Sequence, residues 1–154
     1  MPGVPDATYG FIEPASIGQG GHVVIHGQVS RVAQPANDYA IITGLPGELE
    51  LLVRRGMPAP LANPGDVFDS FTRNQLRICP DGTVAFQAIL NGIAGPEGVW
   101  VGKPGAFAPS FIEGHQAPGF PEGAVFEGNF DWACNGAGGV VALRAKVEGG
   151  GAGV

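Results

Sequence analysis

Apolar positions alternate with polar or small ones along three similar stretches, residues 22–29, 83–90 and 140–147. Successive side chains of a β-strand point to opposite faces of its sheet. One face of these stretches carries only apolar residues or Gly: Val23, Ile25, Gly27 and Val29, then Val84, Phe86, Ala88 and Leu90, then Val141, Leu143, Ala145 and Val147. The opposite face, with His22, Val24, His26 and Gln28 in the first stretch, is mixed. The pattern predicts three equivalent strands that turn the first face to a core and leave the mixed face partly wet.

Shorter apolar segments lie between these stretches, and turn residues bound them. Further strands are expected at 11–17, 39–43, 48–54, 67–78, 98–101, 106–113 and 125–134. The chain has 27 Gly and 14 Pro, which interrupt almost every helical window and are typical of turns between short strands. The sequence therefore predicts an all-β protein.

Turn landmarks recur at a spacing of 58 residues. Gly44, Pro46 and Gly47 correspond to residues 102, 104 and 105, and Gly56 corresponds to Gly114. A fixed period of this length indicates a repeat architecture, here tandem four-stranded antiparallel units like propeller blades. A barrel or a sandwich remains the alternative. Residues 1–10 are expected as a lead-in, 11–147 as one repeat domain of about two and a half units, and 148–154 as a flexible Gly-rich tail.

An array of this size leaves sheet edges and apolar ends open, so we expect further repeats or self-association to cover them. The net charge of −6 argues against a nucleic-acid partner, which would require clustered cations. No apolar run approaches the roughly 18 residues of a membrane span, and no signal peptide or anchor is visible. Membrane insertion by this chain is therefore not expected.

Three groups of spaced residues carry a family resemblance. They are Gly82-x-x-Ala85-Phe86-Gln87-Ala88, Gly98-Val99-Trp100-Val101-Gly102-x-x-Gly105, and Gly114-x-x-Ala117-Pro118-Gly119 followed by Phe126 and Phe130. The chain resembles the bacterial tandem-repeat family known by the motif Asn-x-x-Gly-x-x-Ala-Phe, whose members carry variable C-terminal anchors. It departs from that motif at Cys79, which stands in place of Asn. The resemblance implies an extracytoplasmic repeat protein of unassigned activity. Because the repeat carries no convergent set of catalytic residues, we expect a non-catalytic structural or binding module of a bacterial cell-surface or secreted protein.

Histidines and serines give no catalytic pattern. His22 and His26 share one strand face but lie four residues apart, roughly 13 Å in a strand, which is too far for one metal ion. They are interpreted as solvated or half-buried strand residues, and His115 as a loop residue. Ser16, Ser30, Ser70 and Ser110 lack the Gly-x-Ser-x-Gly context of a nucleophile. We expect no catalytic residue, no metal and no cofactor.

Carboxylates near turns are part of an alternative function, because propeller-like repeats would bring equivalent loops together at one end. They are Asp66, Asp69, Asp81, Glu113, Glu122, Glu127 and Asp131. Most are expected to be solvated, and Asp81 to stabilise its Pro-Asp-Gly turn. Trp100 and Trp132 are expected in the core, but either one could line a ligand groove. With such a groove, the protein would be a carbohydrate-binding or glycoside-hydrolase-like module.

The chain has two cysteines, Cys79 and Cys134, without the spacing of metal ligands. Each precedes one of the similar stretches, and equivalent positions of adjacent repeats are usually too far apart for a disulfide. Two free, partly buried thiols are therefore expected, with a disulfide as the alternative.

Overall fold

The computed structural model describes residues 8–12, 16–30, 39–92, 94–134 and 141–149, and all its regular elements are β-strands. These are β1 (Thr8–Ile12), β2 (Ser16–Ile17), β3 (Val23–Ser30), β4 (Tyr39–Leu45), β5 (Glu48–Arg54), β6 (Phe68–Ile78), β7 (Val84–Leu90), β8 (Glu97–Lys103), β9 (Ala106–Ile112), β10 (Val125–Cys134) and β11 (Val141–Glu148). The all-β prediction is confirmed. Within the described residues no sheet closes into a barrel.

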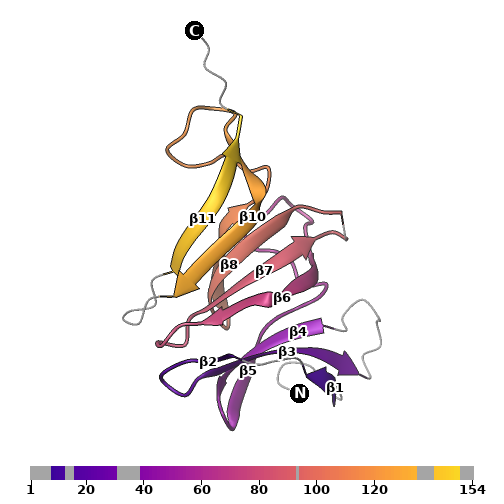
Figure 1. Cartoon of the computed structure of the whole chain (residues 1–154). Coiled ribbons are helices and arrows are strands. Elements are labelled where there is room, and N and C mark those ends of the chain that lie inside the picture. The colour runs from indigo at the N-terminus through magenta and orange to yellow at the C-terminus, as the bar shows by residue number, and fades with distance from the viewer. Residues whose placement is uncertain (1–7, 13–15, 31–38, 93, 135–140, 150–154) are drawn as a thin grey trace.

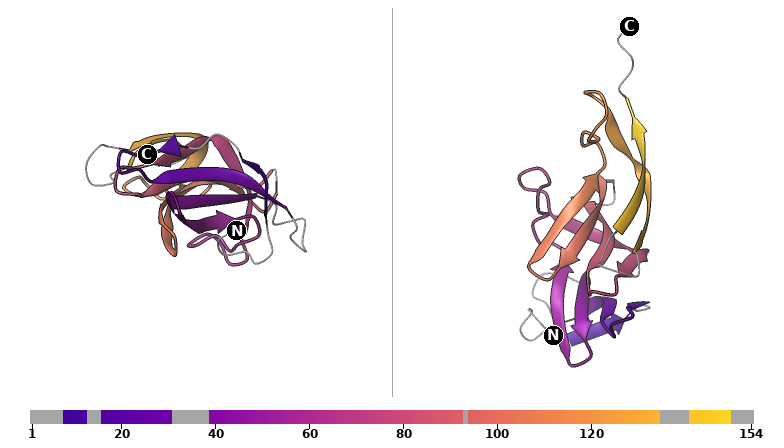
Figure 2. Two further views of the ribbon diagram at one scale, coloured as in Figure 1. Left: turned by 90° about the horizontal axis from the view of Figure 1, so that it is seen from below. Right: turned by 90° about the vertical axis from the view of Figure 1, so that its left-hand side faces the viewer.

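The strands form three antiparallel sheets that follow one another in chain order. The first sheet has the order β1-β3-β4-β5 with β2 also paired to β3, the second is β6-β7-β8-β9, and the third is β10-β11. Figure 1 shows the first sheet at the bottom, the second in the middle and the third at the top. The right-hand view of Figure 2 shows the same succession along the long axis. β1 starts earlier than the strand predicted at 11–17, because Thr8 already pairs with Ser30.

The hairpins β4–β5 and β8–β9 of the first two sheets have the same strand pairing, with residue numbers that differ by a constant. Ile42 pairs with Leu51 in the first sheet, and Trp100 pairs with Pro109 in the second. All six partner pairs of β4 and β5 recur in β8 and β9 when 58 is added to each residue number. The recurrence includes the irregularity after Ile41, which reappears after Val99. The two hairpins therefore have the same pairing and the same bulge.

The connections that lead to the second and third sheets also correspond. The N–H of Gly56 donates to the carbonyl oxygen of Phe68, and that of Gly114 donates to Phe126, both at 2.8 Å. Within the loops, the amides of Ala59 and Ala117 bond to carbonyls seven residues later, at 2.9 and 2.8 Å. These bonds place each new sheet in the same way relative to the preceding hairpin.

Two hydrophobic clusters join the sheets. One combines Val24, Ile41 and Val53 of the first sheet with Phe68, Phe86 and Trp100 of the second. The other combines Ala85, Val99 and Phe111 of the second sheet with Phe126 and Ala145 of the third. The second sheet is therefore packed on both faces. We call the face with Phe86 and Trp100 its front and the face with Ala85 and Val99 its back, and we use the same terms for equivalent positions of the other sheets.

The predicted faces need a correction in β3. Val24 and His26, on the face predicted to be wet, are only 0% and 4% exposed, whereas Val23 and Ile25 are half-buried. The mixed face of β3 belongs to the back of the first sheet, and this back packs against the second sheet. Val24 and His26 are buried for that reason. In β7 the predicted core face is buried, but so is the mixed face, including Gln87 at 6% exposure. The side chains of residues 141–144 lie outside the described residues.

Candidate functional site

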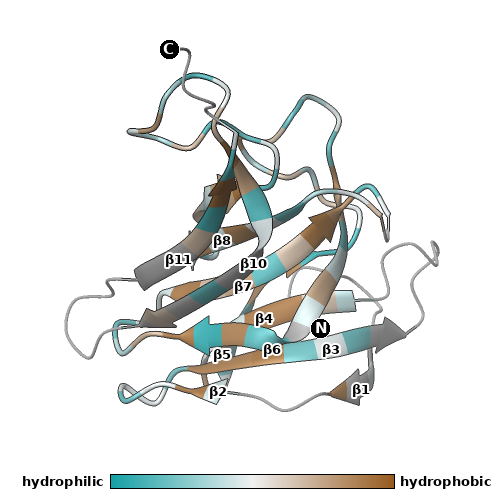
Figure 3. Ribbon diagram, turned by 45° about the horizontal axis from the view of Figure 1, so that its top comes forward, coloured by the Kyte–Doolittle hydropathy of each residue, from teal (hydrophilic) through white to brown (hydrophobic). Residues whose placement is uncertain are grey.

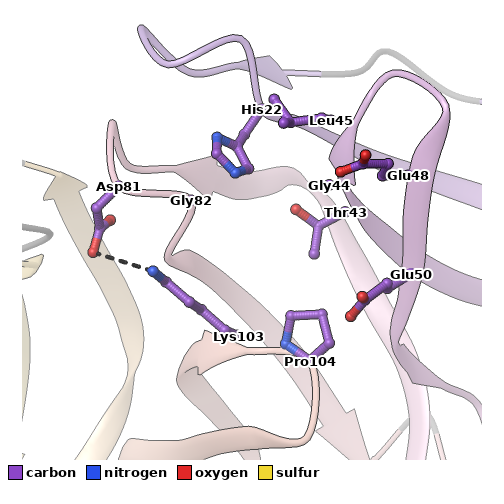
Figure 4. A pocket seen from close by; sticks show the side chains of 10 residues that line it. All are labelled: His22, Thr43, Gly44, Leu45, Glu48, Glu50, Asp81, Gly82, Lys103 and Pro104. Carbon is purple, nitrogen blue, oxygen red and sulfur yellow. Dashed lines mark ion pairs between the residues drawn. The ribbon is translucent and has the colours of Figure 1, made fainter.

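A cavity of about 220 Å³ lies where hairpin turns of the first and second sheets meet. Figure 4 shows its lining side chains. They are His22, Thr43, Gly44, Leu45, Glu48 and Glu50 from the first sheet and its turns, with Asp81, Gly82, Lys103 and Pro104 from those of the second. We call this cavity the turn pocket. The pocket exists because the back of the first sheet faces the second sheet, so turns at the same end of both are brought together.

The first-sheet wall carries two carboxylates. Glu48 and Glu50 alternate along β5, so both side chains project from the same face of the strand, toward the pocket. Thr43 lies opposite Glu50 in the register of β4 and β5. Its hydroxyl donates to the carbonyl oxygen of Val23 at 3.0 Å, which satisfies this buried group. The wall therefore presents acceptor oxygens to the cavity.

The second-sheet wall carries Asp81 and Lys103. Asp81 accepts hydrogen bonds from the backbone N–H of Thr83 at 3.0 Å and from its hydroxyl at 2.8 Å. This confirms the predicted structural role of Asp81 in its turn. The ammonium group of Lys103 lies 3.8 Å from the same carboxylate. The backbone bond from Thr83, then its side-chain bond and the charge of Lys103, lower the pKa of Asp81 below its ordinary value of 3.8.

The imidazole of His22 lies between the two walls, next to Gly82. A Cβ added to Gly82 would lie 3.0 Å from Cδ2 of the imidazole, so the ring fits closely against this glycine. The Nδ1 atom of His22 is buried and has no hydrogen-bond partner among the described residues. His22 is half-buried as predicted, but it lies just before β3 and not within the strand. Its place in a pocket is an addition to that prediction.

The pocket chemistry favours cations and hydrogen-bond donors. Three carboxylates face one ammonium group, so the lining is net negative when its acids are ionised. A depressed pKa keeps Asp81 ionised near neutral pH, which makes it unsuitable as a general acid. Among the described residues no three His, Cys, Asp or Glu side chains gather as metal ligands would.

The other candidate carboxylates lie apart from the turn pocket. Asp69 forms an ion pair with Arg55 at 2.7 Å, and Asp66 accepts a bond from the amide N–H of Asn63 at 3.0 Å. Glu113 accepts the N–H of Glu97 at 3.1 Å, and Glu127 forms an ion pair with Lys146. Glu122 and Asp131 are exposed. Of the predicted carboxylates, the turn pocket contains Asp81 alone.

The remaining histidines and serines are dispersed. His26 is buried, contrary to the prediction, with its ring 5.7 Å from that of Tyr39 and 6.0 Å from that of Phe71. His115 is a loop residue as predicted, and with Ser110 it lines a second hollow of about 170 Å³. Ser16 and Ser70 are half-buried on strands, and the side chain of Ser30 lies outside the described residues.

Trp100 is a core residue. It is 0% exposed and packs edge-on against Phe68 at 4.9 Å between ring centroids. This confirms the core interpretation and removes Trp100 from any ligand groove. The side chain of Trp132 lies outside the described residues.

Cys79 also corrects a prediction. It is completely buried and takes part in a disulfide bond, so the expected free thiol is wrong. The other cysteine of the chain is Cys134, whose side chain lies outside the described residues.

Sequence reasoning missed Glu48, Glu50 and Lys103 as site residues. The recurrence of residues at a spacing of 58 contains a signal for Glu48 and Glu50. The framework positions Gly44 and Pro104 recur as residues 102 and 46, whereas Glu48 and Glu50 are replaced by Ala at 106 and 108. The absence of recurrence at these positions shows that the repeat does not require the two carboxylates there.

Comparisons with known proteins give a family but no activity. The described residues contain no helix that is long and apolar enough to cross a membrane. No curated protein and no solved structure matches the chain. Residues 1–153 match a family of unknown function, DUF7453, and the chain belongs to this family.

Proposed function

We propose that this chain is a non-catalytic β-repeat protein that serves as a structural or binding module of a bacterial cell-surface or secreted protein. Its units would be four-stranded, about 58 residues long and arranged like propeller blades. The recurrence of the β4–β5 pairing and its bulge in β8–β9 carries this proposal. Equal pairing, equal loop hydrogen bonds and equal packing direction are what a repeat architecture requires.

The disulfide of Cys79 supports the proposed location. Disulfides form and persist mainly in oxidising compartments outside the cytoplasm. A buried disulfide therefore agrees with the extracytoplasmic setting that the family resemblance implies.

The turn pocket supports a binding role in addition to a structural one. Repeat packing explains residues that recur, but Glu48, Glu50 and Lys103 have Ala106, Ala108 and Leu45 at their equivalent positions. These polar side chains are therefore not needed by the framework. Their carboxylates suit a small ligand that carries an ammonium group or several hydroxyls.

Amide NMR spectra of the labelled chain test the binding role. Spermidine and a panel of neutral and amino monosaccharides are the probes, and shifts are expected at the amides of Thr43, Glu48 and Glu50. The Glu48→Gln/Glu50→Gln variant should lose them, because it removes both charges but keeps the side-chain size. Glu122→Gln, at an exposed residue outside the pocket, is the matched control. Shifts confined to other amides, or equal binding by the pocket variant, would remove the turn pocket from the proposal.

The alternative is a carbohydrate-binding or glycoside-hydrolase-like module. The observation that favours it is that carboxylates line two opposite walls of one cavity. Because Asp81 stays ionised, Glu48 or Glu50 would have to act as the acid. Hydrolysis of chromogenic glycosides that disappears in Glu48→Gln or Glu50→Gln, but persists in Glu122→Gln, would establish the alternative and overturn the non-catalytic role.

A further inference from the structure

Among the described residues, no element covers the front of the first sheet in the way that the first sheet covers the front of the second. Ile17 pairs with Val23 as Ile78 pairs with Val84, so the two isoleucines hold equivalent positions. Ile78 is 8% exposed, and Ile17 is 72% exposed. Ile12, opposite Gly27, corresponds to Phe71, opposite Ala88, and the exposed fractions are 51% and 8%. The same positions are thus buried in one sheet and open in the other.

The exposed positions form one apolar strip. Directly paired residues of neighbouring strands share a face, so Ile12 and Ile17 lie on the same side as Val23 and Ile25 of β3. We call these four residues the front strip. Val23 and Ile25 are half-buried, whereas their counterparts Val84 and Phe86 are 0% and 1% exposed. Figure 3 shows hydrophobic colour on β1 and β2 at the margin of the molecule. None of the four side chains is charged, so contact with another apolar surface would bury them at little polar cost.

The opposite end of the molecule does not offer such a surface. Lys146 on the back of the third sheet forms ion pairs with Glu127 and Glu148. Asp131, opposite Arg144 in the register, is exposed on the same face. Docking of a front strip onto this charged back would desolvate several ionised groups, which is costly. A head-to-tail chain of copies is therefore disfavoured. Of the two end faces that the described residues form, the front strip is the one that matches a front strip of a second copy.

We infer that two copies of this chain associate front strip to front strip about a twofold axis. An interface that uses the same patch on both partners closes after two subunits. The charged back of the third sheet lies outside the contact in this arrangement. The sequence pattern predicts further repeats or self-association as the cover of the open ends, and the inference selects self-association. It rests on the proposed function only for the equivalence of the sheets.

Sedimentation equilibrium of the full chain over a wide range of concentrations tests the inference. The expected result is a monomer–dimer equilibrium without larger species. The Ile12→Glu/Ile17→Glu variant places charges in the contact, and we expect its dissociation constant to rise by about 100-fold or more. Both residues are exposed, so the far-UV circular dichroism spectrum should not change. If the spectrum does change, the milder Ile17→Ser variant takes its place, with a smaller rise expected.

The matched control is Leu61→Glu/Phe120→Glu. Leu61 and Phe120 are 77% and 56% exposed, but they lie in loops away from the front strip, so this variant should dimerise like the unchanged chain. A folded chain that stays monomeric, growth into larger oligomers, or equal weakening by the control would each overturn the inference. Because ligand shifts at the turn pocket are measured separately, failure of the dimer is distinguishable from failure of the proposed binding role.

Discussion

Leu61 is a large apolar residue in a backbone conformation that disfavours it. Its φ is 57°, and it is 77% exposed in the loop between β5 and β6. The position 58 residues later is Gly119, with φ of 82°. The left-handed region costs an L-residue about 1–2 kcal/mol, which glycine avoids. The difference between the two loops therefore gives a direct test of backbone strain.

We expect Leu61→Gly to raise the free energy of unfolding by about 0.5–1 kcal/mol, because relief of strain exceeds the entropy lost with glycine. Gly119→Ala is the reciprocal change. A Cβ there would meet nothing within 4 Å, so any loss of about 1 kcal/mol must come from the backbone. Urea unfolding measures both variants. If Leu61→Gly destabilises the protein, or Gly119→Ala leaves its stability unchanged, the strain argument fails.

Protonation of a single residue, Asp81, is expected to change the stability of the protein with pH. Hydrogen bonds from Thr83 lower its pKa in the folded state, so ionised Asp81 stabilises the fold above its ordinary pKa of 3.8. That stabilisation is lost as the pH falls through the lower, folded-state pKa. We expect Asp81→Asn to cost at most about 1 kcal/mol at neutral pH, because the side chain is exposed and solvent screens the interaction. The difference from the unchanged protein should shrink below about pH 3.8 in acid titrations of urea unfolding. A difference in the free energy of unfolding that stays constant down to the lowest pH would contradict this account. Glu122→Gln serves as the control at an exposed carboxylate.

At the scale of elements, the strands follow from the sequence but their burial does not. Alternation and turn residues are local, so they placed nearly every strand, such as β7 at Val84–Leu90. The face that a strand buries depends on which sheets lie on each side. Val24 and His26 are buried because the second sheet covers the back of the first, and nothing within residues 22–29 encodes that neighbour. The turn pocket was missed for the same reason, since Glu50 and Lys103 meet only when two sheets pack.

Strand β8 of the second sheet differs from its first-sheet counterpart β4 by an exchange of large and small side chains. Gly98 and Trp100 of β8 correspond to Ala40 and Ile42 of β4. A Cβ on Gly98 would lie 2.8 Å from Cη2 of Trp100, so the indole occupies the space that a side chain at residue 98 would need. We expect Gly98→Ala to destabilise the protein by about 2 kcal/mol, within the range for overpacked cores.

The cost of Gly98→Ala should depend on its neighbour. In a Trp100→Ile background, which copies the first sheet, the same change should cost about 1 kcal/mol less, and a double-mutant cycle on urea unfolding gives this coupling. Trp100→Ile alone will be destabilising because it leaves a cavity among Phe68 and Phe86. Additive effects of the two changes would show that Trp100 does not require the glycine.

At the scale of the whole molecule, we expect the disulfide of Cys79 to contribute to the free energy of unfolding. The chain has only two cysteines, and Cys79 is buried beside the turn that leads into β7. A disulfide restricts the unfolded chain, and loss of one typically costs about 2–4 kcal/mol. We expect no thiol to react with a labelling reagent after unfolding in denaturant without reductant, and two to react after reduction. Reduced protein should unfold at a lower urea concentration. Reaction of two thiols before reduction would contradict the disulfide and would also remove its support for an extracytoplasmic location.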